Sequence, residues 1–90
     1  MRFSDWMSVV GSSTVATANN MRISSLQANN SGATILITTK DTYPITKLNM
    51  VSDLDADKAG RQVEVIVEVA VTVNTVNGTY TTNYGVESLI

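Results

Sequence analysis

Six valines occupy every second position from Val63 to Val73. Because successive side chains of a β-strand point to opposite faces, a period of two places all six valines on one face. β-Branched valine also suits a pleated strand. The opposite face is mixed, with Glu64, Ile66, Glu68, Ala70, Thr72 and Asn74. The pattern predicts one long strand over 61–76 that is buried on its valine face.

The dipeptide Asn77–Gly78 predicts a two-residue hairpin turn after this strand, because both residue types tolerate a positive φ. Pairing around this turn places Glu68 opposite Glu87, which is unfavourable for like charges. A slip by one residue would bring polar side chains onto the valine face, so burial favours the first register. In that register the valine face receives Tyr80, Tyr84, Val86 and Ile90.

The length of the predicted hairpin is its most informative property. A strand over 61–76 spans roughly 50 Å, whereas a compact domain of 90 residues has a diameter of about 30 Å. The hairpin therefore bends around a barrel, projects from the domain or pairs with another chain. Its tip becomes a candidate partner interface, formed by Val76, Asn77, Gly78 and Tyr80.

The remaining chain adds shorter β segments. Residue types predict strands over 33–39 and 43–51, with Pro44 at the start of the second strand or on an edge. Residues 14–26 form a strand or an irregular segment. The predicted fold is all-β: a small antiparallel sandwich or barrel over 14–90, with a long C-terminal β-hairpin.

Residues 1–13 are interpreted as an N-terminal arm. Ser4 suits the cap of a short helix over 5–10, which Gly11 ends. The arm carries Phe3, Trp6 and Met7, which either dock on a partner chain or fold back and close one end of the core.

Composition excludes several kinds of chemistry. The chain contains no cysteine and no histidine, so it lacks disulfides, thiolate metal sites and the commonest general base. Serine and threonine have no such base beside them, and we expect no enzyme activity and no cofactor. The net charge is −2 and the six basic residues are dispersed, which disfavours nucleic acid as a partner. No apolar run is long enough to span a membrane, and no secretory signal is evident.

The uncharged polar content is unusual. Ser, Thr and Asn make up 29 of the 90 residues, while only 16% are charged, against about 25% in ordinary proteins. This balance suits a surface that is partly covered by neighbouring subunits, or an extracellular β protein.

An acidic segment offers one candidate metal site. The spacing of Asp53, Asp55, Asp57 and Glu64 matches ligand positions of a calcium loop. However, Lys58 stands where such loops need glycine, and Glu64 starts a predicted strand instead of a helix. We therefore expect a solvated acidic connection and no bound metal, with calcium as the alternative.

The three tyrosines offer a second candidate site. Tyr43, Tyr80 and Tyr84 could form a platform on which bases stack. No lysine or arginine is adjacent to them in the sequence, so packing within the domain is the favoured interpretation.

The overall character resembles small structural proteins of virions, namely head decoration, connector or tail components of phages. The shared features are a short, weakly charged, cysteine-free chain rich in Ser, Thr, Asn and Val, with an arm and a long hairpin. The resemblance implies a structural assembly protein, located in the virion, that binds other protein subunits as an oligomer. The alternatives are a small β-barrel module for an oligonucleotide or oligosaccharide, and a surface adhesion subunit. These would be cytoplasmic or at the extracellular surface.

Overall fold

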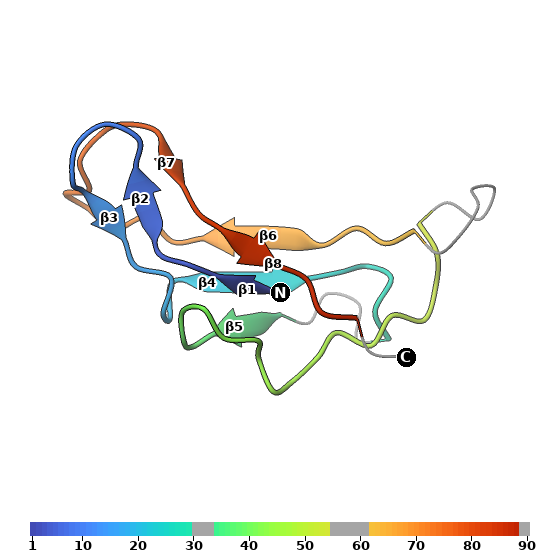
Figure 1. The fold of residues 1–90 in the computed structure, drawn as a ribbon. Coiled ribbons are helices and arrows are strands. Elements are labelled where there is room, and N and C mark those ends of the chain that lie inside the picture. Colours follow the sequence, from blue (N-terminus) through green and yellow to red (C-terminus); the bar gives the residue numbers. More distant parts are fainter. Residues whose placement is uncertain (30–33, 55–61, 89–90) are drawn as a thin grey trace.

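The computed structural model describes residues 1–29, 34–54 and 62–88, and every regular element in these ranges is a β-strand (Figure 1). The strands are β1 (Arg2–Phe3), β2 (Trp6–Ser8), β3 (Thr14–Val15), β4 (Met21–Ser24), β5 (Ile35–Ile37), β6 (Ile66–Val69), β7 (Tyr80–Thr81) and β8 (Tyr84–Gly85). They form three antiparallel sheets, with strand orders β1-β8, β3-β2-β7 and β5-β4-β6. The predicted all-β class is confirmed, and the described strands do not close into a barrel.

Two of the sheets are parts of one ribbon. Strands β1 and β2 follow each other along one side, and β8 and β7 along the other. Between the two pairings the register changes by one residue, so that Asp5 and Trp6 both stand opposite Thr82. This is a β-bulge, which bends the ribbon and re-aims its side chains. The bend allows the N-terminal strands to contribute to both sheets.

The third sheet follows the alternation that a half-buried strand requires. Met21 and Ile23 of β4 point inward and are buried, while Arg22 between them is exposed. In the register, Val69 and Val67 of β6 lie opposite these two apolar residues. The valine face thus packs on the same side as the core residues of β4.

The core lies between the ribbon and this sheet. Its buried members are Phe3, Met21, Ile23 and Ile37, with Met1, Trp6, Ile35, Leu48, Val65 and Val69 packed around them. The indole N–H of Trp6 donates to the sulfur of Met21 over 3.2 Å. Strand β1 therefore covers the inner face of β4 and β5 with Phe3.

The predicted C-terminal hairpin is wrong. Strand β6 pairs with β4, while β7 and β8 pair with β2 and β1. Strands β1 and β2, in residues 2–8, pair with the segment that the prediction had placed beside the valine strand. This pairing is favourable because it buries Phe3 and places Trp6 against the core. Strand β6 gains Met21 and Ile23 as cross-strand neighbours. The predicted burial of the valine face is only partial, since Val65 and Val69 pack against the core while Val63, Val67, Val71 and Val73 are exposed.

The turn that reverses the chain also lies elsewhere. Asn74 has φ 74° and the N–H of Thr75 bonds the carbonyl of Thr72, which makes a turn over 72–75. Asn77 is not among the residues with positive φ, although Gly78 has φ 154°. A two-residue hairpin turn needs positive φ at Asn77 as well, so Asn77–Gly78 does not form it.

Several other elements differ from the prediction. The expected helix over 5–10 is replaced by β2, and the expected strand over 43–51 is reduced to a single bridge between Ala28 and Met50. The strand predicted over 33–39 is present as β5, and 14–26 contains both β3 and β4. Residues 1–13, predicted as an arm, supply two paired strands. Of the long strand predicted over 61–76, residue 61 lies outside the described residues, and 62–76 contains only the short strand β6.

Candidate interaction surface

Five of the seven residues predicted to contact a partner line one hollow of about 430 Å³. They are Trp6, Val76, Asn77, Gly78 and Tyr80. The sequence indicated them as two separate places, an arm and a hairpin tip. The structure brings them together because β7 pairs with β2.

The other two predicted residues lie elsewhere. Met7 is exposed, on the opposite side of β2 from Trp6. Phe3 is only 3% exposed and belongs to the core. For Phe3, the alternative in which the N-terminal residues fold back onto the core is therefore the one that the packing supports.

Local hydrogen bonds shape the wall of this hollow. The hydroxyl of Tyr80 donates to the carbonyl of Val76 over 2.6 Å, which closes the loop that contains Gly78. The hydroxyl of Thr75 donates to the carbonyl of Thr72 over 2.7 Å, beside the backbone bond of the same turn. These bonds order the segment 72–80, which lines the hollow together with Trp6.

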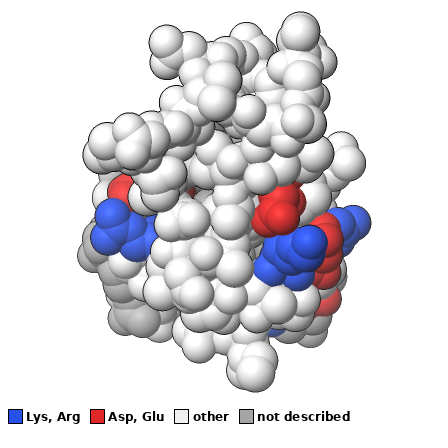
Figure 2. Space-filling model, turned by 90° about the vertical axis from the view of Figure 1, so that its left-hand side faces the viewer, with Lys and Arg blue, Asp and Glu red and all other residues white. Residues whose placement is uncertain are grey.

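None of the described residues that line the hollow is charged. The sequence contains no Asp, Glu, Lys or Arg in 6–21 or in 69–86. The strands and loops over 6–20 and 70–81 form one end of the molecule, which we call the uncharged end (Figure 1). Figure 2 shows this end as a continuous uncharged surface in its upper part, with the charged side chains below it.

Large apolar side chains project from the uncharged end. Val73 is 89% exposed and Val10 is 87% exposed. Further exposed members are Val9, Val71 and Val76. Sequence reasoning missed Val9 and Val10, and the signal that could have found them is the absence of charge in the two stretches.

A second hollow, of about 930 Å³, lies beside the other part of the valine run. Its apolar lining includes Ile23, Leu48, Met50, Val63, Val65 and Val86. Lys47 and Glu87 also line it and form an ion pair of 2.8 Å. Burial lowers the pKa of the Met1 amino group at this hollow, and Lys47 lowers it further, while Glu87 acts in the opposite direction. The valine face therefore borders both hollows, with Val69 and Val71 in the first and Val63 and Val65 in the second.

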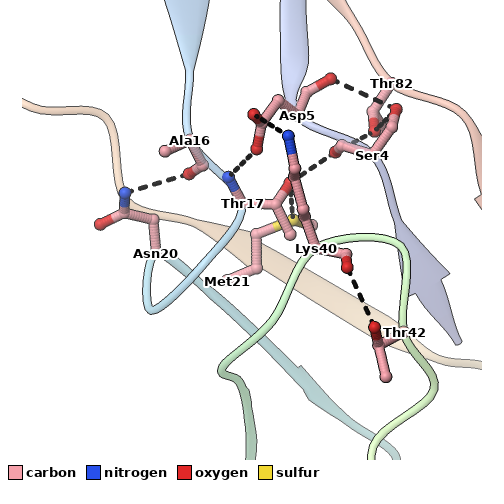
Figure 3. Close-up of polar contacts among 9 residues, drawn as sticks. All are labelled: Ser4, Asp5, Ala16, Thr17, Asn20, Met21, Lys40, Thr42 and Thr82. Carbon is pink, nitrogen blue, oxygen red and sulfur yellow. Dashed lines mark hydrogen bonds and ion pairs between the residues drawn. The ribbon is translucent and has the colours of Figure 1, made fainter.

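A polar cluster stands at the β-bulge (Figure 3). The backbone N–H of Thr17 donates to Asp5 Oδ1 over 3.0 Å, and Lys40 Nζ lies 3.6 Å from Asp5 Oδ2. The hydroxyls of Thr17 and Thr82 both donate to the carbonyl of Ser4. These contacts satisfy the carbonyl of Ser4 at the bulge and the N–H of Thr17 beyond β3. The cluster joins the ribbon to the connection between β3 and β4, which is a structural role.

The candidate calcium loop lies partly outside the described residues, since Asp55 and Asp57 belong to the segment 55–61. The backbone N–H of Glu64 donates to the amide oxygen of Gln27 over 2.8 Å. Within the described ranges, no three Asp or Glu residues gather as a metal site would need. In the same ranges, no helix has the length and apolarity to cross a membrane.

The three tyrosines have different surroundings. Tyr43 has the guanidinium of Arg2 and the ammonium of Lys47 at 5.8 and 5.6 Å from its ring centroid. Tyr84 lies against Phe3, with 6.5 Å between ring centroids. Tyr80 lines the smaller hollow. Arg2 comes from a distant part of the chain and Lys47 lies four residues after Tyr43, so a search for directly adjacent basic residues indicated neither of them.

Comparison with protein-family models, curated proteins and solved structures finds no match to this chain. The function is therefore inferred from the surface of the chain itself.

Proposed function

We propose that this chain is a structural assembly subunit that associates with copies of itself and neighbouring protein subunits through the uncharged end. The observation that supports this most directly is the exposure of Val9, Val10, Val71, Val73 and Val76 on a surface without charge. Contiguous apolar patches on soluble chains mark interaction sites. Interfaces are also depleted of charge at their centre.

The small core gives a second argument. Among the described residues, the buried apolar side chains are Phe3, Val15, Met21, Ile23, Ala28 and Ile37. A chain of this length has a marginal core, and it has no disulfide to reinforce it. Burial of the exposed valines against a neighbour would stabilise the folded chain by roughly 25 cal/mol for each Å² of apolar surface removed from water. Association would therefore stabilise the fold as well as build an assembly.

The proposed setting is a virion. The support for this finer statement is the resemblance in composition and layout to phage decoration, connector and tail proteins. The uncharged, apolar end suits a permanent contact of the kind found in such assemblies, because obligate interfaces are more hydrophobic than transient ones.

The mass of the chain in solution tests the proposal. We expect the unmodified chain to self-associate in sedimentation and light-scattering experiments, and the double variant Val73→Ser/Val76→Ser to associate at least about tenfold more weakly, which is 1.4 kcal/mol. The matched control is Ile45→Ser, since Ile45 is 99% exposed and lies outside the uncharged end. A monomer at millimolar concentration, or an equal loss in the control, would contradict the proposal.

A second function is favoured by one observation. The smaller hollow combines the rings of Trp6 and Tyr80 with the amides of Asn74 and Asn77 and contains no charge. Such a lining suits a neutral oligosaccharide better than an oligonucleotide, which would need basic side chains. Trp6 is the only tryptophan, so its fluorescence reports on this hollow alone. Saturable quenching by a neutral oligosaccharide, with the chain remaining monomeric, would favour this function over assembly.

A further inference from the structure

We infer that the outer edge of β6 pairs with β6 of a second copy, antiparallel and centred on Val67, so that two copies share one continuous sheet. This inference rests on the proposed self-association and names a second contact through which copies join. The β6 pairing does not depend on which residues of the uncharged end contact the neighbouring copy.

The hydrogen-bond pattern shows which backbone groups of β6 are free for such a contact. The N–H of Ala70 donates to the carbonyl of Asn20 over 2.7 Å, continuing the register in which Glu68 faces Arg22. In an antiparallel pair, every second residue directs its N–H and C=O toward the partner strand. Ala70, Glu68 and Ile66 therefore face β4, and the backbone groups of Val65, Val67 and Val69 point away from it. Among the described strands, β6 has no neighbour other than β4.

This edge lacks the features that usually protect exposed strands. Edge strands commonly carry lysine, proline or a bulge that prevents pairing with another chain. The segment 63–71 contains no lysine, no proline and no glycine. Its two charges are Glu64 and Glu68, and Arg22 of the same chain neutralises Glu68 over 3.3 Å. The edge is thus open to a strand of compatible sequence.

The sequence around Val67 is compatible with itself. With a two-fold axis at Val67, Val65 lies opposite Val69 of the second copy. Glu64 then faces Ala70, and Glu68 faces Ile66. A centre at Ile66 would place Glu64 opposite Glu68, and a centre at Glu68 would oppose two copies of the same carboxylate, both of which are unfavourable. Centring on Val67 also uses all three outward residues in both copies.

A second copy is therefore the occupant that charge and register favour. A two-fold contact of this type is isologous and closed, because the same surface serves both partners. Pairing would also cover Val67, which is 38% exposed although β6 belongs to the sheet that carries the core residues Met21 and Ile23.

The first test uses the absence of cysteine from the chain. In the proposed pairing the two Val67 Cα atoms lie about 5.5 Å apart, which is within the range that a disulfide spans. We expect Val67→Cys to form a disulfide-linked dimer under mild oxidation. The matched control is Leu36→Cys on β5, an exposed position whose copies would be separated by five strand spacings, or roughly 24 Å. The control should remain monomeric on a non-reducing gel.

The second test changes only the backbone of the edge. Val67→Pro removes an N–H that points away from β4, and proline is tolerated on an edge where that N–H faces solvent. Val67→Ala keeps the N–H and shortens the side chain. We expect proline to abolish the contact and alanine to weaken it only a few-fold. Both are made in the Val73→Ser/Val76→Ser chain, so that the uncharged end does not hide the result, and circular dichroism checks the fold.

The outcomes separate the inference from the proposed function. Self-association of the unmodified chain without the Val67→Cys cross-link would overturn the strand pairing and leave the assembly function standing. Equal weakening by alanine and proline would assign the contact to side-chain packing and also overturn the pairing. A monomeric unmodified chain at millimolar concentration would overturn both. A cross-link at Val67 that the Leu36 control lacks would support the inference even where Val67→Pro fails to fold.

Discussion

The two halves of this chain differ in what they bury. Every buried side chain of the described residues lies between Phe3 and Ile37, and none lies in 38–54 or 62–88. The second half nevertheless contains the valine run, which is the most regular apolar pattern in the sequence. The difference teaches that an apolar period of two predicts a strand but not its burial. Burial also needs a second layer, and here the ribbon of β1 and β2 supplies that layer mainly over β4 and β5.

The sharpest way to break this comparison is to truncate one side chain from each half. Met21→Ala should lower the free energy of unfolding by about 2–5 kcal/mol, because Met21 is fully buried and the fold would be left with a cavity. Val71→Ala should change it by less than about 0.5 kcal/mol, because Val71 is largely exposed. Urea denaturation at low protein concentration measures both. Similar losses would show that the valine run is as much a part of the core as β4.

The polar cluster at the bulge offers a second test of the first half, because it joins the ribbon to the connection between β3 and β4. Asp5→Ala should cost about 1–3 kcal/mol, because it leaves the N–H of the fully buried Thr17 without its acceptor. Lys40→Ala is the matched control: it removes the exposed partner of Asp5 and should cost less than about 1 kcal/mol. Thermal unfolding of the two variants distinguishes them. An equal cost would assign the role to the ion pair instead of the backbone acceptor.

The sequence predicted the kinds of element better than their partners. The alternation in 63–73 and the residue types in 33–39 indicated strands, and β6 and β5 lie there. Local pattern could not decide which strand β6 would join, because both β4 and the 80–85 segment offer apolar alternation to it. Tertiary competition decided it, since pairing of 80–85 with the N-terminus buries Phe3.

The residues of the candidate surface were predicted, but not that they lie together, because that depends on which strands pair. Trp6, Val76, Asn77, Gly78 and Tyr80 were indicated by exposure arguments on separate segments, and the strand pairing gathers them at one hollow. Phe3 was predicted either to dock on a partner chain or to fold back onto the core, because it is apolar and its segment showed no clear regular structure. Its partner strand, β8, lies at the opposite end of the chain, where no local signal connects the two.

The position of the turn in the second half offers a test of intermediate size. Asn74 has φ 74°, where alanine is strained, so Asn74→Ala should lower stability by about 1 kcal/mol and Asn74→Gly should not. Asn77→Ala should change stability by less than about 0.5 kcal/mol, because Asn77 does not have a positive φ. Chemical denaturation of the three variants measures this. The opposite ranking would return the turn to Asn77–Gly78 and restore the hairpin.

The smallest expected effect tests the pairing of β4 with β6, which joins the two halves of the chain. Arg22 of β4 and Glu68 of β6 are cross-strand neighbours with 3.3 Å between their charged groups. A double-mutant cycle of Arg22→Ala and Glu68→Gln should give a favourable coupling of about 0.2–1 kcal/mol that salt reduces, as for other exposed pairs. The matched cycle of Glu68→Gln and Glu87→Gln should give no coupling, because Glu87 pairs with Lys47 instead. In the hairpin register Glu68 would face Glu87, so repulsion between these two carboxylates would be the sign that β6 had left β4.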